Sequence, residues 1–463
     1  MQENYNDFIK KISDKKILFC GLGKSNLPFI NMLTDENIKV IAYDSKSSEN
    51  LDESIINNLK NNPLASLRAG DESVWNENID ILVRTPGMNF LSENISKLKN
   101  RGTAITSEME IFFDIFPGKI IGITGSDGKT TTSTLIYEML KAQGLDVFLG
   151  GNIGNPLLPQ IKRMNKNSIA VIELSSFQLI SMRKSPEIAV ITNISPNHLD
   201  IHKNMEEYIF AKKQIIEHQN AFSKTIINFD NEITKSFENI IRGQKVFFSR
   251  TSKNINGVWI DDNNNIIYSS NGKDEKIMDV SEIKIAGEHN KENFLTAIGA
   301  VYGIVSSENI KKIANTFNGV EHRIEFVREL NGVRFYNDSI ASSPTRTISG
   351  TLSLFEQKII LIAGGYDKKI PFEELAKKIT QKVSIVILMG HTADKIEEKV
   401  RQSDVNNDVR ILKVTCMENA VKKAHEISKH GDIIVLSPAC ASFDLYKNFE
   451  ERGKDFKNIV NKL

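Results

Sequence analysis

The sequence predicts an α/β protein built from three domains. Its 463 residues are enough for about three domains of ordinary size. Short apolar segments that fit buried strands alternate with amphipathic segments that fit helices, as in a mostly parallel sheet. Several of the predicted strands end in glycine-rich or polar loops, at the edge where open α/β sheets bind ligands. We place the domains at residues 1–106, 107–319 and 320–463.

Composition and charge exclude several classes of function. Lys and Arg total 59 against 58 Asp and Glu, so no general positive field attracts nucleic acid or an anionic membrane, and phosphate recognition must be local. Cys20, Cys416 and Cys440 are scattered and fit neither a disulfide framework nor a zinc site. A polar N-terminus and the lack of a membrane-length apolar run predict a soluble cytoplasmic protein.

The first domain opens with an incomplete nucleotide-binding pattern. A strand leads into Gly-Leu-Gly at 21–23 and then a helix, and a second strand ends at Asp44, where ribose hydroxyls are often held. Asn26 stands in place of the third glycine of the dinucleotide fingerprint, so the pattern supports a dehydrogenase only weakly. A strand at 79–83 ends in a second loop suited to ligands, 84–88. We predict a Rossmann-like domain.

The central domain is organised around residues 119–144. An apolar strand leads into the turn Gly-Ser-Asp-Gly at 125–128, and Lys129-Thr130 opens an amphipathic helix. This arrangement wraps backbone N–H groups around a polyphosphate and adds a lysine charge and a hydroxyl for Mg²⁺. The first glycine of the standard spacing would fall at Ile123, so an unliganded turn is the alternative. We predict a P-loop ATPase-like domain that binds a nucleoside triphosphate.

Two further loops of the central domain, 173–178 and 193–200, follow predicted strands and carry polar groups. Glu173 is the candidate Mg²⁺ ligand, because a carboxylate at a strand end near a phosphate loop suits that ion; a solvated carboxylate is the alternative. His198 fits either a ligand or a capping residue, and its pattern alone favours the second. Residues 250–285 are polar and turn-rich and predict a small antiparallel excursion.

The third domain starts near Gly319 and again alternates strands with helices, which predicts a second Rossmann-like α/β domain. Its predicted strands are 358–363, 384–389, 409–414 and 432–436. Polar loops follow two of them, at 364–368 and 437–442.

These motifs together resemble the Mur ligase family, and the likeness covers essentially the whole chain. No single motif suffices; their order and spacing make the assignment specific. They are Thr124-Gly-Ser-Asp-Gly-Lys-Thr, Gly151-Asn-Ile-Gly, Glu173-Leu-Ser-Ser-Phe-Gln, Asn193-Ile-Ser-Pro-Asn-His-Leu-Asp, His289-Asn290 with Asn293, His322-Arg323, Asn337-Asp-Ser, Ser437-Pro-Ala-Cys-Ala-Ser-Phe-Asp and Phe449-Glu-Glu-Arg-Gly. The last two, with the loop at 84–87, point to the member that uses D-glutamate.

The resemblance implies an ATP-dependent ligase that adds D-glutamate to UDP-N-acetylmuramoyl-L-alanine through an acyl phosphate. This reaction belongs to cytoplasmic peptidoglycan precursor synthesis, and so to cell-wall biogenesis, cell shape and division. ATP and two Mg²⁺ ions are the implied cofactors. The implied partners are the two small-molecule substrates, with no nucleic acid or membrane and with the enzyme a monomer. ATP bound by the central domain, with its adenine held by the third, implies domain closure.

The resemblance also implies roles for individual residues, position by position. For the UDP substrate these are Ser25, Asp44, Gly87, Asn152 and His198. For ATP they are Gly125, Ser126, Asp127, Gly128, Lys129, Thr130, Thr131, Asn290, Asn293, Arg323 and Asp338. The implied metal ligands are Thr130, Glu173, His198 and Lys212, with Lys212 carbamylated. For D-glutamate they are Lys368, Ser442, Phe443 and Phe449, and the implied catalytic residues are Lys129, His198 and Lys212.

Departures from the family pattern leave some contacts open. Ile340 and Ser342 stand where the family often has Lys and Thr, and Asn197 stands where it usually has Asp. One cationic contact to the amino acid's carboxylates is therefore missing, and Arg346 is a candidate replacement. Three other classes stay as alternatives: a folylpolyglutamate synthetase, a P-loop kinase or nucleotide switch, and a module that binds ATP without turnover.

Overall fold

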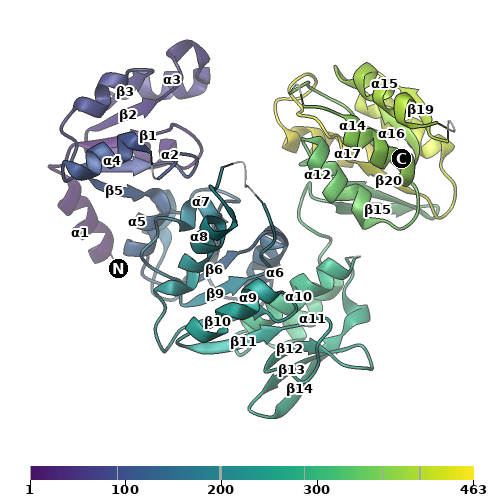
Figure 1. Cartoon of the computed structure of the whole chain (residues 1–463), viewed down its shortest axis with the longest axis horizontal. Coiled ribbons are helices and arrows are strands. Elements are labelled where there is room, and N and C mark those ends of the chain that lie inside the picture. Colours follow the sequence, from purple (N-terminus) through teal and green to yellow (C-terminus); the bar gives the residue numbers. More distant parts are fainter. Residues whose placement is uncertain (1, 91, 198–200, 286, 369, 406–407) are drawn as a thin grey trace. The chain divides into compact units, whose positions relative to one another are not determined.

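The computed structural model describes residues 2–90, 92–197, 201–285, 287–368, 370–405 and 408–463. These residues form three sheets with helices packed against them (Figure 1). The chain divides into two compact units, Met1–Ile283 with Glu288–Asn315, and Lys284–Gly287 with Thr316–Leu463. The first unit holds two of the sheets and the second unit holds one, which confirms the predicted α/β class.

The first sheet has five parallel strands in the order β3-β2-β1-β4-β5. The strand order changes direction between β1 and β4, because the chain first builds the sheet toward β3 and then toward β5. The loops after β1 and β4 therefore diverge at the carboxyl edge of the sheet, as in a Rossmann-like fold. The strands are β1 (Ile17–Cys20), β2 (Val40–Asp44), β3 (Ala65–Ala69), β4 (Ile81–Arg84) and β5 (Ala104–Ser107). The helices are α1 (Gln2–Ile12), α2 (Asn26–Asp35), α3 (Glu53–Lys60) and α4 (Glu93–Asn100).

The central sheet has the strand order β14-β13-β12-β11-β10-β9-β6-β8-β7. It is parallel from β7 to β12, and β12, β13 and β14 pair antiparallel, which confirms the predicted excursion. The strands are β6 (Lys119–Thr124), β7 (Val147–Gly151), β8 (Ile169–Glu173), β9 (Ile188–Ile191), β10 (Lys224–Asn228), β11 (Gln244–Phe248), β12 (Gly257–Ile260), β13 (Asn265–Ser270) and β14 (Lys273–Asp279). The helices are α5 (Glu108–Ile115), α6 (Lys129–Ala142), α7 (Ser176–Leu179), α8 (Met205–Glu217), α9 (Glu232–Lys235), α10 (Glu288–Val301) and α11 (Ser307–Thr316).

The two sheets of the first unit share one hydrophobic core. Phe19 and Phe29 of the first sheet layer belong to the same buried cluster as Phe112 of α5 and Ile172 of β8. Strands β8 and β9 are buried along their whole length, which explains why they are apolar runs and not alternating segments. This shared core makes the loops at the carboxyl edges of both sheets parts of one unit.

The sheet of the second unit has the order β15-β16-β20-β17-β18-β19, parallel except for the β15–β16 hairpin, which the sequence did not predict. Separate buried clusters line its two faces. The strands are β15 (Glu325–Leu330), β16 (Val333–Asn337), β17 (Ile359–Ala363), β18 (Val383–Leu388), β19 (Arg410–Lys413) and β20 (Ile433–Leu436). The helices are α12 (Pro344–Ser349), α13 (Thr351–Leu354), α14 (Glu373–Lys382), α15 (Ala393–Ser403), α16 (Met417–Ile427) and α17 (Phe449–Lys462).

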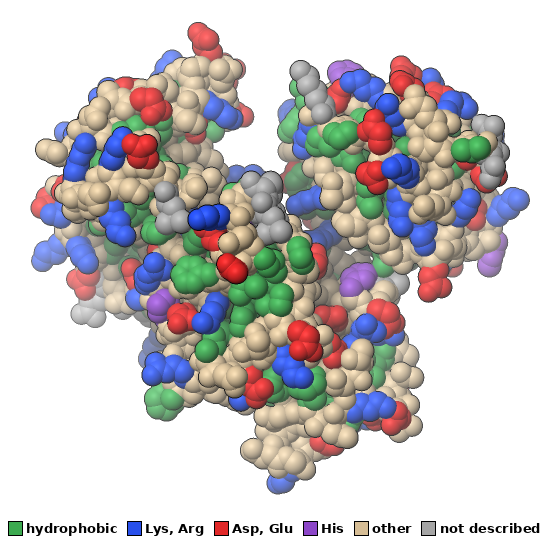
Figure 2. Space-filling view, in the orientation of Figure 1, with side chains coloured by type: hydrophobic (Ala, Val, Ile, Leu, Met, Phe, Trp, Pro, Cys, Tyr) green, Lys and Arg blue, Asp and Glu red, His purple; other side chains and the backbone are tan. Residues whose placement is uncertain are grey.

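The surface agrees with the balanced composition. On the face shown in Figure 2, basic and acidic side chains are interspersed over each part of the chain. In the described part of the chain, no helix combines the length and the apolar character needed to cross a bilayer.

Candidate active site

The glycine turn between β6 and α6 has a shape that only glycine accommodates at two positions. Gly125 has φ 152° and Gly128 has φ 75°. A Cβ at Gly125 would lie 1.8 Å from Thr192 Oγ1, and one at Gly128 would lie 2.4 Å from Asn293 Oδ1. The turn is therefore packed tightly against neighbouring segments, and it directly precedes the first turn of α6 in the chain.

The segment after β9 supports the turn. The Ser126 N–H donates to Asn193 O and the Asp127 N–H donates to Asn193 Oδ1, both at 2.9 Å. Thr192 Oγ1 donates to Asp127 O at 2.6 Å, and Ser126 Oγ donates to Ser195 O at 2.9 Å. Sequence reasoning found the motif that begins at Asn193 but gave Thr192 and Asn193 no role, because these contacts join residues far apart in the chain.

Two lysines meet behind the turn. Lys129 Nζ donates to Gly125 O and Ser126 O, both at 2.9 Å, and Lys212 Nζ donates to Gly125 O at 2.7 Å. Lys212 comes from α8, is 2% exposed, and its Nζ lies 4.7 Å from the centre of the Tyr208 ring. Burial, and then the charge of Lys129, lower the pKa of Lys212 well below its usual value. The structure therefore brings both predicted lysines together and favours a neutral amine at Lys212.

Glu173 ends β8 close to the turn. Its side chain is buried, and Oε1 accepts a hydrogen bond from Asn152 Nδ2 at 2.9 Å. The buried Oε2 has no hydrogen-bond partner among the described residues. A buried carboxylate oxygen left without a donor is costly unless a cation or another donor meets it, so this oxygen fits a hard metal ion.

Helix α10 places the predicted nucleotide residues Asn290 and Asn293 beside α6. Thr132 Oγ1 donates to Asn293 Oδ1 at 3.3 Å, and Asn293 Nδ2 donates to Asn290 Oδ1 at 3.2 Å. The close approach of Asn293 to Gly128 places this pair at the turn. Thr130 and Thr131 lie in the first turn of α6, immediately after Lys129.

The first sheet gathers the predicted UDP-site residues at its carboxyl edge. Asp44 Oδ2 accepts from the Leu22 N–H at 3.1 Å, so the acidic residue after β2 contacts the loop after β1. Asn26 Nδ2 donates to Cys20 O at 3.1 Å and to Gly21 O at 2.9 Å. The residue that breaks the fingerprint thus holds the turn in place. Ser25 directly precedes α2, and exposed Gly87 lies in the loop after β4.

In the second unit, Asp338 follows β16 and is buried. Its Oδ2 accepts from Thr351 Oγ1 at 2.7 Å and from Ser437 Oγ at 2.8 Å. Burial raises the pKa of Asp338 to about 6 in spite of these donors and the charge of Arg323. The charge of Arg323 thus reaches Asp338, and the nucleotide role of the two residues stays a prediction.

Two loops that the sequence assigned to D-glutamate lie side by side at the carboxyl edge of this sheet. The Tyr366 N–H donates to Ala441 O at 2.9 Å, and the rings of Tyr366 and Phe443 lie edge to face at 6.0 Å. Ser442 is buried, whereas Phe443 and Lys368 are exposed. These loops belong to the second unit alone.

Arg452 of α17 connects these loops and was missed as a site residue. Its guanidinium is 1% exposed and donates to Ser339 Oγ at 3.1 Å, Ser339 O at 2.9 Å, Ala441 O at 3.1 Å and Cys440 O at 3.1 Å. Ser339 Oγ in turn donates to Phe449 O at 2.8 Å. The motif that starts at Phe449 was a usable signal, but Ser339 lies 113 residues before Arg452 in the chain.

Some predictions on site residues stay open. His198, expected as a catalytic, substrate and metal-binding residue, lies outside the described residues. Arg346, the suggested replacement for the missing cationic contact, is exposed on α12. The Ile340 N–H donates to His322 O at 3.1 Å, a backbone bond that does not depend on the side chain.

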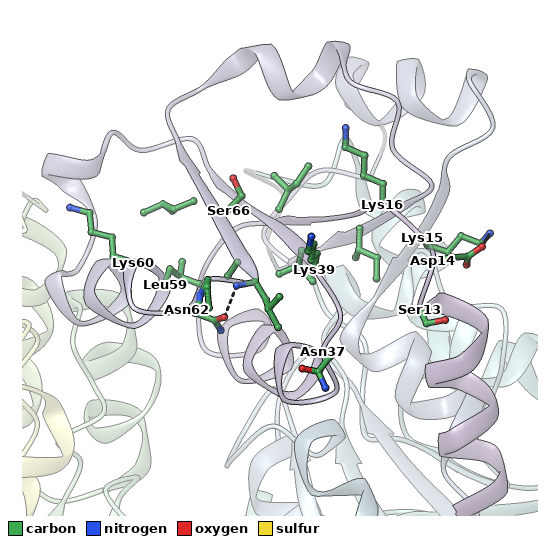
Figure 3. A pocket seen from close by; sticks show the side chains of 17 residues that line it. Ser13, Asp14, Lys15, Lys16, Asn37, Lys39, Leu59, Lys60, Asn62 and Ser66 are labelled. Carbon is green, nitrogen blue, oxygen red and sulfur yellow. Dashed lines mark hydrogen bonds and ion pairs between the residues drawn. The ribbon is translucent and has the colours of Figure 1, made fainter.

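A cavity of about 830 Å³ lies away from the site residues of the first unit, at the amino ends of β1, β2 and β3. Figure 3 shows it between Lys16, Lys39 and Lys60, whose ammonium groups do not converge on one point. Ligands of parallel sheets bind at the carboxyl edge, which is the opposite one. This cavity is therefore not the predicted UDP site.

A glycine turn between a parallel strand and a helix, together with Rossmann-like sheets, is typical of a nucleotide-binding α/β protein. The model of the Mur ligase middle domain matches residues 123–301, and that of the Mur ligase glutamate ligase domain matches residues 322–440. The UDP-N-acetylmuramoylalanine–D-glutamate ligases of Acetivibrio thermocellus and Clostridium acetobutylicum are each 48% identical to this chain over 100% of both chains. The chain belongs to the Mur ligase family, as the sequence motifs predicted.

Solved structures agree with this fold. The UDP-N-acetylmuramate-alanine ligase MurC from Thermotoga maritima has a TM-score of 0.58 at 16% identity, covering 97% of this chain and 99% of that chain. A pseudomurein peptide ligase type C from Methanothermus fervidus has a TM-score of 0.53 at 18% identity, covering 97% and 100%. At these identities the likeness concerns the fold alone.

Gly128→Ala is expected to weaken ATP binding at least about tenfold, because the added methyl group displaces Asn293 and strains a left-handed residue. The matched control is Gly144→Ala, just after the same helix. Gly144 has φ 82° and open space around its Cβ, so that variant carries similar strain without the clash. Calorimetric titration with a non-hydrolysable ATP analogue measures both. Equal affinities in the two variants would contradict the assigned role of the turn.

Proposed function

We propose that this protein is the ligase that adds D-glutamate to UDP-N-acetylmuramoyl-L-alanine, using ATP, in peptidoglycan precursor synthesis. The observation that carries the proposal is the full-length identity of 46% to 48% to ligases that bear this name. Residues 1–106 would bind the UDP substrate, residues 107–319 ATP and residues 320–463 the amino acid. The enzyme acts in the cytoplasm, as a monomer.

The reaction needs activation of a carboxylate, because a carboxylate is a poor acylating agent. The L-alanyl carboxylate attacks the γ-phosphorus of ATP, the bond to the bridging oxygen breaks, and ADP leaves with that electron pair. The amine of D-glutamate then attacks the acyl phosphate, loses a proton, and expels inorganic phosphate. Every species in this sequence is anionic, so the protein contributes positioning and positive charge.

This chain's own groups supply that charge. The N–H groups at the start of α6 would face the phosphates, and Lys129 lies directly behind the turn, whose Ser126 and Asp127 N–H groups are held by Asn193. The amine of D-glutamate attacks the acyl phosphate itself, so the reaction requires no side-chain nucleophile. Mg²⁺, when bound, neutralises phosphate charge; Thr130, Glu173 and a carbamylated Lys212 would hold it, with His198 as a further expected ligand. The unpaired Oε2 of Glu173 supports this fit.

The amino acid's identity is the sharpest test of the proposed function. D-Glutamate is expected to support amide formation and phosphate release, and L-glutamate is not, because inverting the centre misplaces the amine or a carboxylate. The assay measures phosphate and product with a panel of amino acids and UDP-N-acetylmuramoyl-L-alanine. Omitting the UDP substrate is the control, since a kinase or simple ATPase would not require it. Faster turnover of L-alanine or a diamino acid would assign the chain to another ligase of the family.

Lys212 is expected to work as a carbamate. Carbamylation needs the neutral amine, and burial beside Lys129 lowers the pKa of Lys212 and so raises the neutral fraction at pH 7. The adduct would present two anionic oxygens to a metal, whereas an ammonium would repel it. Lys212→Ala should lose at least ~10²-fold in turnover, as when a charge-stabilising group is removed, and short carboxylic acids should restore part of it.

The control for Lys212 is Lys213→Ala, which removes the next lysine of the same helix; it pairs with Glu217 at 3.4 Å and should stay within about twofold of wild type. Crystals of the metal-loaded enzyme, or NMR with ¹³C-labelled CO₂, report the adduct directly. An unmodified Lys212 in an active, metal-loaded enzyme would sink this assignment.

The raised pKa of Asp338 predicts a pH dependence of ATP binding. The carboxylate is the form that accepts from ribose hydroxyls, and it is lost as pH falls through about 6. The wild type should therefore lose affinity for an ATP analogue by about tenfold between pH 7 and pH 5 beyond any change in Asp338→Asn. The variant corrects for the phosphate groups of ATP, which titrate in the same range. Parallel pH profiles of the two proteins would contradict the role of Asp338.

A further inference from the structure

Arg84 ends β4, immediately before the loop that carries Gly87, and its guanidinium reaches out of its own sheet layer. It is 1% exposed. Nη2 donates to Phe177 O at 3.0 Å and to Ser181 Oγ at 2.6 Å. Nη1 lies 3.4 Å from Met88 O, within the same loop as Gly87. One side chain thus contacts both the predicted UDP loop and a segment of the central sheet layer.

The segment that Arg84 contacts follows directly in the chain after Glu173, the proposed metal ligand. α7 starts at Ser176, three residues after Glu173, and its start is closed by a capping box between Ser175 and Gln178. The ring of Phe177 stacks on His202 at 4.9 Å, and His202 Nε2 shares a hydrogen bond with Ser176 Oγ at 2.8 Å. Because these contacts hold the turn together, a movement of the turn would also move the backbone of Glu173.

The charge of Arg84 has no direct counter-ion. Within the described residues no carboxylate lies within 4.0 Å of its guanidinium, and burial lowers its pKa from the usual value. Glu110 interacts with it only at longer range, and partly through Ser181. The guanidinium carbon also lies 5.4 Å from the centre of the Phe90 ring. Retaining a buried guanidinium without a direct carboxylate partner is often unfavourable compared with an apolar side chain of similar size. Packing of the interface therefore does not explain why an arginine stands here.

We propose that Arg84 is a positioning residue that transmits binding of the UDP substrate, in the loop after β4, to the turn that carries Glu173. This inference rests on the proposed function of that loop. Arg84 itself touches no reacting atom. It couples the two loops because one planar group donates to both, which lysine, with a single nitrogen, cannot reproduce.

The test is hydrogen exchange on the full chain with and without UDP-N-acetylmuramoyl-L-alanine. In the wild type the substrate should slow amide exchange both at 84–90 and at 174–182; in Arg84→Met it should slow exchange only at 84–90. In steady-state assays Arg84→Met should raise KM for the UDP substrate and lower kcat, each by about tenfold, with KM for D-glutamate unchanged. Arg84→Lys should fall between. Arg101→Met is the matched control, because the Arg101 guanidinium donates to Trp75 O at 3.0 Å within the first sheet layer, and it should behave as wild type.

Ser181→Ala keeps the inference testable if Arg84→Met folds poorly, since it removes the shortest contact from the other side and should also reduce the slowing at 174–182. Equal slowing at 174–182 in wild type and both variants, or none in the wild type, would overturn the role of Arg84. Wild-type turnover is measured in the same buffer. If the wild type turns over D-glutamate but the substrate does not slow exchange at 174–182, only the role of Arg84 is rejected. If the wild type shows no turnover, the proposed function is rejected.

Discussion

Two lysines that donate to one carbonyl, Gly125 O, are the interaction on which the rest of the first unit depends. Lys129 approaches it at 2.9 Å and Lys212 at 2.7 Å. Two ammonium groups so close, in a buried place, repel each other strongly. The repulsion is relieved if one of the two ammonium groups loses its proton. Lys212 is the more buried of the two lysines, so its ammonium group is the less stable one. The same geometry therefore holds the glycine turn in shape and lowers the pKa of Lys212.

This constraint accounts for the topology around the turn. Lys129 of α6 and Lys212 of α8 both have to reach Gly125 O in the turn. Glu173 has to end β8, the strand that pairs with β6. The order β9-β6-β8 meets this need, because it places the loops after three parallel strands at one edge. The loop after β9 holds the N–H groups of the turn in place, and the last residue of β8 supplies the carboxylate. The apolar, fully buried strands below allow no shift of register that would separate these groups.

The local parts of this arrangement were predictable from the sequence, and the long-range parts were not. The strand that ends at Glu173 was predicted with the bounds it has, because an apolar run followed by polar residues defines a buried strand. The turn at 125–130 was predicted for the same reason. Arg84 and Arg452 were not identified, because an arginine in a sequence looks like a solvated charge until tertiary packing buries it. The β15–β16 hairpin was also missed, since β15 is only partly buried and neither strand shows a clean alternation.

Departures from a motif are most informative where the structure shows what the new residue does. Asn26 removes a glycine from the fingerprint, yet its amide donates to the carbonyls of Cys20 and Gly21 and so closes the turn with a side chain. A glycine there allows a close approach of the helix to the strand. An asparagine gives up that approach and gains a fixed turn, while Asp44 still meets the Leu22 N–H from the next strand. The first domain is thus built to hold its glycine loop rigidly at the sheet edge, which suits a domain that presents one end of a long substrate to chemistry performed elsewhere.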